Sequence, residues 1–576
     1  MTTSWQEAAA KKREAISALI PAEWRVDNLP SVKEQVDVTD YIRQYLSEEE
    51  LRITESDADQ IVERTTIGAW TAENVTRAFC HRAALAHQLV LDITSGSLKR
   101  MTLFCLHEIF FDAAIADAKK LDEYFLEHKK PVGPLHGLPI SLKDQFHVKD
   151  VETTMGYVGW IDTFEGKKGT HKEKVYESEM VRELRASGAV LYCKTSVPHT
   201  LMAGETVNNI IGYTFNPKNR NLSSGGSSGG EGALVSIRGS PVGFGTDIGG
   251  SIRIPAGFNG LYGLRPSTGR LPYEGMANSM DGQNTVLSVV GPIGTTVASC
   301  RLVTKALLSQ QPWLHDPLVH EISWRSEEER SVQDLLNFVG EAVPSEKKLA
   351  FGIIHTDNVV TPTAPIRRAI ELVTKALEAA GHVIIPWSPP SHKVLNETGF
   401  RSWVFDGGRN VRDAFALSGE PMAPQVSLYQ NEMKEFTATE IAETNVAMRA
   451  LKKEYMEYWN STASGTGTGR PVDAVISPLA PWPAARRERY KYYGYSTWVN
   501  ALDYSAVAFP VTSVDKTVDV KSSDFKAVDE KDQEIQDDYD PEIYDGAHVS
   551  LQIVGRRLQE EKILAIAEYV GKLIGK

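Results

Sequence analysis

The chain has 576 residues, of which 42% are hydrophobic and 24% charged, and its formal net charge is −13. This composition is ordinary for a globular protein, while the acidic balance argues against a nucleic-acid-binding surface, because such surfaces need clustered lysine and arginine. No run of 18 apolar residues occurs and the N-terminus lacks the apolar stretch of a signal peptide, so we expect neither a transmembrane helix nor secretion.

The first 65 residues carry helical spacing and charge. We expect residues 1–65 to form a helical segment that packs on the main body of the chain, residues 66–576. Within the main body, the first two helices are predicted to begin at Thr71, a good N-cap, and near Phe110.

Short apolar runs further along the chain predict strands. One covers 137–142 and ends at Lys143; another covers 189–193, after a helix that Gly188 ends. A β-α-β pattern follows at 348–354, 366–377 and 383–385. Alternation of this kind indicates an α/β fold, in which helices cover both faces of a sheet.

Two segments interrupt this pattern. Residues 461–469 (STASGTGTG) have the composition of a flexible loop. Residues 529–542 hold eight acidic side chains against one lysine, which favours a solvated insertion over a binding element.

Four widely spaced cysteines, Cys80, Cys105, Cys193 and Cys300, form no CxxC pair. Apolar neighbours such as Phe79 indicate that these thiols are buried. Free buried thiols are typical of a reducing compartment, so we expect a cytoplasmic protein.

Two glycine- and serine-rich turns lie close together in the sequence, at 225–230 (GGSSGG) and 247–251 (DIGGS). The apolar run 241–246 between them predicts a strand that delivers the second turn. Glycine at this density lets the backbone approach a ligand closely and expose its N–H groups, as an oxyanion site requires. The strand and turn together therefore predict a platform for a nucleophile.

The stretch 225–270 resembles the signature of the amidase signature family of serine hydrolases. Further segments that resemble this family are 133–144 (GPLHGLPISLKD), 193–198 (CKTSVP), 290–292 (VGP) and 549–557 (VSLQIVGRR). The resemblance spans residues 70 to 570, and the opening residues 4–24 look most like the fungal acetamidase or general amidase branch. It implies one large α/β domain with a mixed, twisted sheet flanked by helices on both faces.

The resemblance also implies a Ser–Ser–Lys triad. Ser251 matches the nucleophile, Lys143 the base, and Ser227 the relay between them, held by a cis peptide bond after Gly226. The backbone of Ile248, Gly249, Gly250 and Ser251 matches the oxyanion site, and Leu201 matches the position whose backbone lines the site opposite the nucleophile. Ser228, Asp247 and Arg253 match supporting positions that shape the turn.

A lysine acts as a base only when it is neutral, and its ordinary pKa is about 10.4. Burial disfavours the charged form and lowers this pKa. The run 140–142 before Lys143 (ISL) is apolar enough for such burial. A serine hydroxyl needs a base of this kind because it is a poor nucleophile while protonated.

Competing motifs fit less well. Residues 225–229 satisfy the G-x-S-x-G pattern of α/β-hydrolases, but that pattern needs an apolar strand before it, and 216–224 is polar. His107-Glu108 and His320-Glu321 begin zinc-protease patterns that lack the second histidine, and no phosphate loop of the G-x₄-G-K-[ST] type occurs. We therefore expect neither a metal nor a cofactor.

The sequence as a whole predicts an enzyme that cleaves a small-molecule carboxylic amide to a carboxylate and ammonia or an amine. Alternatives are specificity for fatty-acid or aryl amides, a role as subunit of a tRNA-dependent amidotransferase, and a non-catalytic scaffold. The loops 200–215 and 400–480 are expected to form the acyl pocket. A homodimer is compatible with the sequence.

Overall fold

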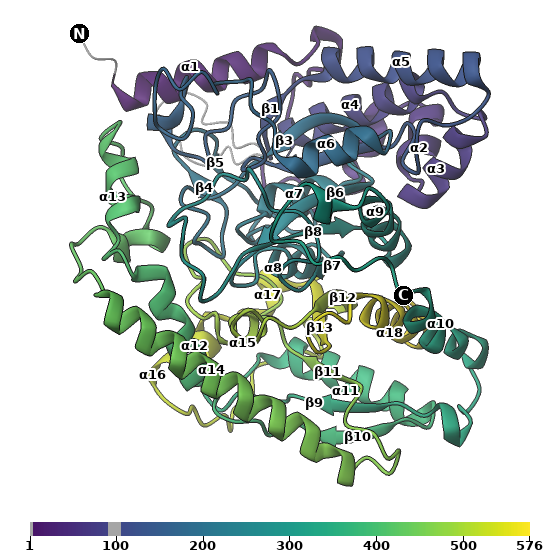
Figure 1. The fold of residues 1–576 in the computed structure, drawn as a ribbon, viewed down its shortest axis with the longest axis vertical. Helices are drawn as coiled ribbons and strands as arrows, with labels where there is room; N and C mark the ends of the chain where they lie inside the picture. The colour runs from purple at the N-terminus through teal and green to yellow at the C-terminus, as the bar shows by residue number, and fades with distance from the viewer. Residues whose placement is uncertain (1–3, 90–104) are drawn as a thin grey trace.

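The computed structural model describes residues 4–89 and 105–576 of the chain. Within these residues eleven strands form one mixed sheet, in the order β1-β3-β2-β6-β8-β7-β12-β13-β11-β9-β10 (Figure 1). The strands are β1 (Leu106–Ile109), β2 (Pro139–Lys143), β3 (Val190–Thr195), β6 (Val242–Asp247), β7 (Tyr262–Arg265), β8 (Val289–Gly294), β9 (Ala350–Ile353), β10 (Val383–Pro386), β11 (Ala474–Ser477), β12 (Ala506–Ser513) and β13 (His548–Val554). Two short strands, β4 (Val207–Asn208) and β5 (Gly212–Tyr213), form a separate ribbon.

The sheet mixes parallel and antiparallel pairs. β2 runs parallel to both β3 and β6, and β9 runs parallel to β10 and β11. The pairs in the middle of the sheet, including β6 with β8 and β12 with β13, are antiparallel. Every residue of β2 and of β6 is buried, as is typical of strands covered on both sides.

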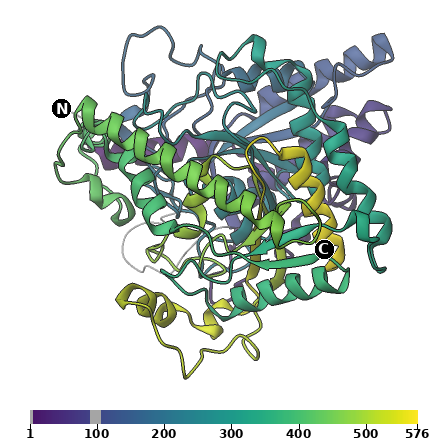
Figure 2. The same ribbon diagram turned by 60° about the horizontal axis from the view of Figure 1, so that its bottom comes forward.

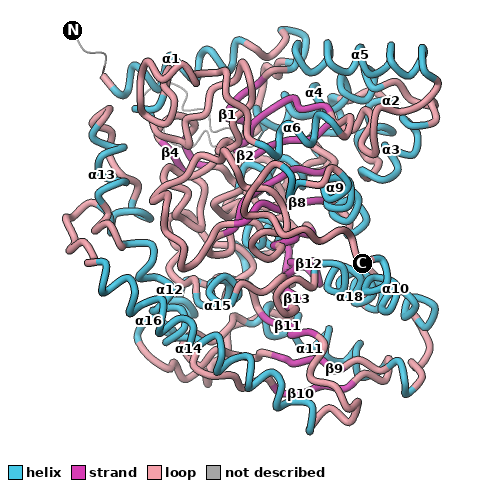
Figure 3. The backbone as a smooth tube through the Cα atoms, viewed as in Figure 1, coloured by secondary structure: helices cyan, strands magenta, loops and turns pink. Residues whose placement is uncertain are grey.

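Helices flank this sheet along its whole length (Figures 1 and 2), and loops fill much of the region in front of β2 and β8 (Figure 3). The helices are α1 (Trp5–Ala18), α2 (Glu48–Thr54), α3 (Ala58–Thr66), α4 (Ala72–Leu89), α5 (Phe111–His128), α6 (Glu179–Ala186), α7 (Gly229–Ser236), α8 (Arg253–Phe258), α9 (Val297–Ser309), α10 (Ser326–Gln333), α11 (Ala364–Ala379), α12 (His392–Phe400), α13 (Arg409–Ala416), α14 (Ala438–Ser461), α15 (Gly494–Leu502), α16 (Glu530–Asp538), α17 (Pro541–Tyr544) and α18 (Glu560–Leu573). The molecule is thus a single large α/β domain, as the sequence predicted.

In helix α4 the local sequence determines where the helix begins and which side chains it buries. The hydroxyl of Thr71 accepts the N–H of Asn74, and the carboxylate of Asp122 on α5 accepts the N–H groups of Ala72 and Glu73. These bonds satisfy donors that a helix start leaves free, and the negative charge favours this end of the helix dipole. The apolar side chains that repeat at helical spacing from Val75 onward are buried.

The predicted helices after Thr71 and Phe110, the strands ending at Lys143 and after Gly188, and the β-α-β pattern β9-α11-β10 are all confirmed. The four cysteines are free and buried, as expected. The boundary at residue 65 stays a prediction; residues 4–66 hold α1 to α3, and Lys12 of α1 forms an ion pair with Glu108 of β1 at 2.6 Å. No helix in the described ranges has both the length and the apolar character needed to cross a membrane.

The two segments predicted to be irregular have different outcomes. After α14 ends at Ser461 and a short 3-10 turn covers 462–464, residues 465–469 form the predicted loop, in which the hydroxyl of Thr466 donates to the carbonyl of Arg470 at 2.6 Å. The prediction for the acidic segment needs correction. The acidic segment 529–542 folds into α16 and α17, with Asp532 and Ile535 buried. The carboxylate of Asp532 accepts the N–H of Thr361 at 2.8 Å, so the inner face of this segment is packed rather than solvated.

Candidate active site

Strands β2 and β6 bring the two predicted parts of the site to one edge of the sheet. They are parallel neighbours, with Ser141 opposite Gly243. Their carboxyl ends therefore meet, which places Lys143 beside the turn 247–251 that follows β6. Side chains at this edge of a parallel sheet commonly form ligand sites.

Lys143 and Ser227 are in direct contact. The amine of Lys143 donates to the hydroxyl of Ser227 at 2.7 Å and to the hydroxyl of Thr246 at 2.7 Å. Lys143 is fully buried and Ser227 is 1% exposed. The Gly226–Ser227 peptide bond is cis, as the resemblance implied, and α7 begins two residues later.

Burial changes the protonation of Lys143. It lowers the pKa of the amine from 10.5 to about 7, because a charged ammonium loses its hydration in the protein interior. The negative charges of Asp247 and Glu231 act in the opposite direction and raise this pKa. The balance leaves a substantial fraction of neutral amine near neutral pH.

Ser251 lies at the surface of a cavity of 490 Å³. Its side chain remains largely buried, with 8% of the residue exposed. Its carbonyl accepts the N–H of Ser228 at 3.2 Å, which ties the turn 247–251 to the start of α7. The hydroxyl of Ser228 in turn lies 3.4 Å from the backbone N of Thr246, so Ser228 braces β6 against α7.

The turn 247–251 contains backbone N–H groups that were predicted to form an oxyanion site. The N–H groups of Ile248, Gly249 and Ser251 have no hydrogen-bond partner within the part of the chain that the structure describes. Gly250 differs from the expectation, because its N–H donates to the carboxylate of Asp247 at 2.7 Å. Three of the four predicted donors are thus free to bind an oxyanion, and Gly250 closes the turn instead.

The closed turn requires glycine at position 250. Gly250 has φ +123°, and a Cβ atom there would lie 2.6 Å from side-chain atoms of both Ile254 and Ser496. An L-residue rarely adopts such a φ. The second turn of the signature is therefore glycine-rich for a steric reason.

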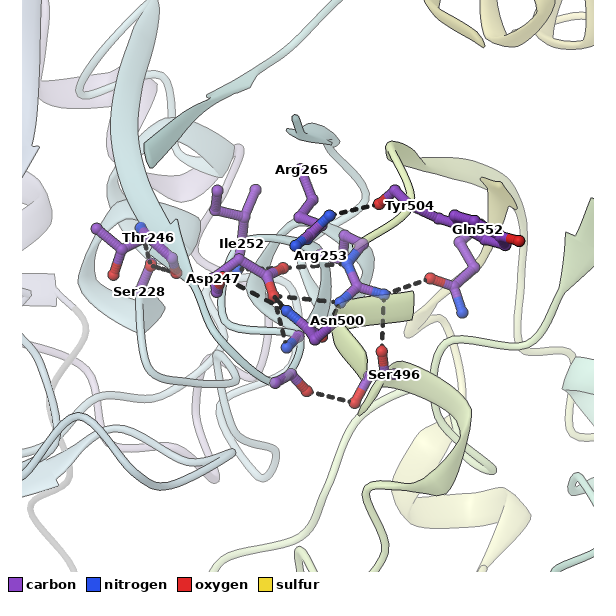
Figure 4. A network of polar contacts seen from close by, with 12 residues as sticks. Ser228, Thr246, Asp247, Ile252, Arg253, Arg265, Ser496, Asn500, Tyr504 and Gln552 are labelled. Atoms are coloured by element: carbon purple, nitrogen blue, oxygen red, sulfur yellow. Dashed lines mark hydrogen bonds and ion pairs between the residues drawn. The ribbon is translucent and has the colours of Figure 1, made fainter. Parts of the chain in front are cut away.

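Asp247 anchors this turn through several hydrogen bonds (Figure 4). Its carboxylate accepts the N–H groups of Gly250 and Ile252, the amide of Asn500 at 2.7 Å, and the guanidinium of Arg253 at 3.0 Å. Asp247 and Arg253 are both fully buried, and the guanidinium holds the pKa of the carboxyl well below its usual range.

Arg253 is itself fixed by three further acceptors (Figure 4): the side-chain oxygens of Asn500 and Gln552, each at 2.7 Å, and the carbonyl of Ser496 at 3.1 Å. These partners come from α15 and β13, far along the chain. Through these bonds Asp247 and Arg253 connect the turn to the C-terminal part of the sheet.

Leu201 borders the same cavity, in the left-handed conformation with φ +63°. The predicted loop 200–215 contributes Leu201, Met202 and Ala203 to the wall, and 400–480 contributes Phe400, Trp403, Gln425, Leu428 and Tyr429. Gly226, Ile248 and Gly249, which the resemblance had singled out, also line this cavity. Sequence reasoning missed the rest of the lining, which is Ile254, Val359, three residues of α12 (Lys393, Asn396, Glu397), Tyr492, Tyr493, Gly494, Thr497, Asp529 and Lys531.

The acidic segment also contributes to the wall of this cavity. Asp529 and Lys531 line the cavity beside α12, at a distance in sequence that no motif reveals. Sequence reasoning also missed Thr246, which accepts from Lys143, Gln145, which accepts from Thr246, and Glu231, whose charge acts on Lys143. A glutamate inside the otherwise apolar, glycine-rich start of α7 was the one visible signal for Glu231.

Glu231 is a fully buried carboxylate whose charge acts on Lys143. Its carboxylate accepts the hydroxyls of Ser141 at 2.6 Å and Thr195 at 2.8 Å, and burial raises its pKa to about 7. No group of three or more histidine, cysteine, aspartate or glutamate side chains that could hold a metal ion occurs in residues 4–89 and 105–576.

Comparison with known proteins agrees with this geometry. A family model described as Amidase matches residues 74–564. The chain belongs to the amidase signature family. It is 46% identical to an acetamidase of Emericella nidulans and 44% identical to an acetamidase of Aspergillus oryzae, in each case over 100% of this chain and 99% of the relative. The solved structure of a fatty acid amide hydrolase is 32% identical and superimposes with a TM-score of 0.87, covering 99% of this chain and 95% of that one. The enzyme is an amide hydrolase.

Proposed function

We propose that the enzyme cleaves carboxylic amides through an acyl intermediate on Ser251, with Lys143 as the base and Ser227 as the relay. The contact of 2.7 Å between the amine of Lys143 and the hydroxyl of Ser227 carries this proposal. A base must lie within hydrogen-bond reach of the proton that it removes, and its pKa should lie near the working pH. Lys143 meets both conditions.

In the first half-reaction, neutral Lys143 takes the proton of Ser227 while Ser227 takes the proton of Ser251. The oxygen of Ser251 attacks the amide carbon, and the carbonyl π bond moves its electrons to oxygen. As the tetrahedral intermediate collapses, the C–N bond breaks and the proton passes from Lys143 through Ser227 to the leaving nitrogen. Ammonia or an amine departs, and the acyl group remains on Ser251.

In the second half-reaction, water takes the place of the amine. Ser227 and Lys143 accept a proton from water as its oxygen attacks the acyl carbon. The bond to Ser251 then breaks, Ser251 recovers its proton from Ser227, and the carboxylic acid leaves, losing its remaining proton to solvent to become the carboxylate. Both halves use the same proton path, which closes the cycle without a cofactor.

The developing oxyanion is stabilised by the N–H groups of Ile248, Gly249 and Ser251. Donors that are already oriented are among the largest contributions to catalysis; loss of one costs about 10²–10³ in rate. Leu201 lines the wall that faces the nucleophile. Gly250, Asp247, Arg253 and Ser228 act by holding the turn in place.

The substrate is proposed to be a small aliphatic amide, because two relatives that match the whole chain are acetamidases. The cavity favours a second candidate, an amide with a larger acyl or amine part. Its 490 Å³ lies within the range of pockets that hold drug-sized ligands, and its lining includes Phe400, Trp403 and Tyr429.

A substrate panel tests these candidates. Turnover of acetamide, hexanamide, benzamide and oleamide is compared as kcat/KM. A maximum at acetamide supports the first candidate, and a rise with acyl size supports the second. If a folded preparation turned over none of these amides, the proposed function would be contradicted. The alternatives, a non-catalytic scaffold or an amidotransferase subunit, would then be favoured.

We also propose a cytoplasmic location and no role in nucleic-acid binding. The four free, buried thiols and the net charge of −13 support these two proposals. Cell fractionation tests the location. Sedimentation tests whether the protein forms a homodimer, which the sequence left open.

A further inference from the structure

Lys143 is held by two hydroxyls, and the proposed proton path uses only that of Ser227. Through the other hydroxyl a chain of hydrogen bonds runs from Lys143 to Thr246 at 2.7 Å, from Thr246 to the side-chain oxygen of Gln145 at 2.5 Å, and from the side-chain nitrogen of Gln145 to the hydroxyl of Tyr273 at 3.1 Å. Gln145 is fully buried and Thr246 is 3% exposed. Nothing in the proposed proton path uses this chain.

The direction of each bond in this chain is fixed by Gln145. Its side-chain nitrogen donates to the carbonyl of Ala277 at 2.9 Å, and a carbonyl can only accept. The reversed amide would set two acceptors against each other, so the amide oxygen must face Thr246. Because an amide oxygen only accepts, the hydroxyl of Thr246 donates to it, and the oxygen of Thr246 is left to accept from Lys143.

This direction matters for the neutral amine. A neutral lysine carries two N–H bonds and one lone pair, and only the lone pair can accept a proton. One N–H is engaged by Thr246. The proton of the Thr246 hydroxyl is committed to Gln145, so Thr246 cannot occupy the lone pair, which stays available to Ser227.

We propose that Gln145 is a positioning residue that acts through Thr246 to keep the lone pair of Lys143 directed at Ser227. Nucleophile–base pairs are commonly completed by a third group that orients the base, and Gln145 fills that place here. The inference rests on the proposed function, since it assumes that Lys143 is the base. Asp247 and Glu231 are the charged groups that act on Lys143, and Gln145 adds no charge to them.

This chain of hydrogen bonds predicts that a second substitution, at Thr246, partly restores the activity lost by a substitution at Gln145. In Gln145→Met, which keeps the size of the side chain but removes the acceptor, the freed hydroxyl of Thr246 donates to the lone pair of Lys143. We expect kcat to fall about 30-fold or more with little change in KM, as an order of magnitude for a mispositioned base. Thr246→Val alone removes one bond to Lys143 and is expected to cost less, and Thr246→Ser keeps the hydroxyl and stays near wild type.

The double variant decides between positioning and packing. Valine cannot donate a proton, so Gln145→Met/Thr246→Val should be faster than Gln145→Met alone. A purely structural role for Gln145 predicts that the two losses multiply, and a double variant slower than either single variant would overturn the proposal. An unchanged kcat in Gln145→Met would overturn it as well.

The measurements are kcat and KM for the best amide and the rate constant for labelling of Ser251 by a fluorophosphonate, which reports activation of the nucleophile without product release. Thr153→Val is the matched control, because Thr153 also accepts a lysine N–H, from Lys194 at 2.8 Å, in a buried site away from Ser251. It should keep kcat within about twofold. Thermal unfolding of each variant shows whether it folds.

If wild type is not labelled at Ser251, the proposed function fails. If wild type is labelled and the losses of the two single variants multiply in the double variant, only the role of Gln145 fails.

Discussion

The amine of Lys143 and the hydroxyl of Ser227 lie 2.7 Å apart in a place where neither residue is more than 1% exposed. A buried lysine of this kind is normally neutralised by a carboxylate in direct contact. Here its two hydrogen-bond partners among the described residues are the uncharged hydroxyls of Ser227 and Thr246. Because these partners carry no charge, burial dominates the pKa of Lys143.

The pH dependence of the reaction follows from this pKa. Below about pH 7 Lys143 is protonated and cannot accept a proton, so kcat/KM should rise with pH through this value and then level off. Lys143→Arg should be as damaging as Lys143→Ala, because arginine stays protonated. Steady-state rates between pH 5 and 9 test both statements. A Lys143→Arg enzyme with substantial activity would mean that position 143 supplies only charge.

The same pKa shift makes a prediction about stability. The pKa of Lys143 is about 7 in the folded protein, and its ordinary value, which applies to the unfolded chain, is 10.5. The unfolded state therefore binds more protons between these values, and the wild-type protein becomes more stable as pH rises from 7 to 10.5. Lys143→Met removes this dependence. At pH 7 and below, its free energy of unfolding should exceed that of wild type by a few kcal/mol. The free energy that the two lost hydrogen bonds of Lys143 contributed is subtracted from this gain.

Chemical unfolding of wild type and Lys143→Met at pH 6.5 and pH 9.5 measures this difference in stability. The difference should shrink at the higher pH, because less of the cost of deprotonating Lys143 on folding remains there. Equal differences at both pH values would show that the pKa is not shifted.

Removing the hydroxyl of Ser227 should reduce activity less than removing the hydroxyl of Ser251. Ser227→Ala removes the hydroxyl that is proposed to pass protons between Lys143 and Ser251, and a water molecule can partly replace it. We expect a reduced but measurable kcat, above that of Ser251→Ala. Single-turnover rates for the two variants make the comparison. A Ser227→Ala enzyme with wild-type rates would rule out the relay.

Arg253→Met should destabilise the fold and the turn together. It leaves the carboxylate of Asp247 buried without its charged partner, a change that costs about 3–5 kcal/mol in comparable sites. Arg77→Met is the matched control, because Arg77 is 49% exposed and pairs with Glu73 within one helix, an interaction worth less than about 1 kcal/mol. Urea unfolding of both variants gives the two costs. Equal, small costs would mean that the Asp247–Arg253 pair does not anchor the turn.

The sequence predicted the parts of this site that depend on local pattern. Apolar runs located β2 and β6, and the Gly/Ser turns located Ser227 and Ser251, because turn chemistry is written in neighbouring residues. The resemblance to a family supplied the pairing of Lys143 with Ser227. Neither composition nor spacing shows that two residues 84 positions apart form a hydrogen bond.

What the sequence did not reveal depends on contacts between distant segments. Asp529 belongs to a run of acids that looks solvated, yet the fold brings it to the cavity wall. Gln145 lies two residues after Lys143, but its importance comes from the carbonyl of Ala277, 132 positions away. Gly250 was expected to donate to the oxyanion, and only the position of Asp247 shows that its N–H is already used.

The central claim is that Ser251 carries the acyl group. The most direct measurement is treatment of the enzyme with a fluorophosphonate, followed by intact-mass analysis and peptide mapping of the adduct. One adduct per chain should form on Ser251, labelling should slow as pH falls below about 7 because Lys143 becomes protonated, and Ser251→Ala should take no label while keeping the wild-type unfolding curve. An adduct on another residue, or amide turnover by folded Ser251→Ala, would contradict the account.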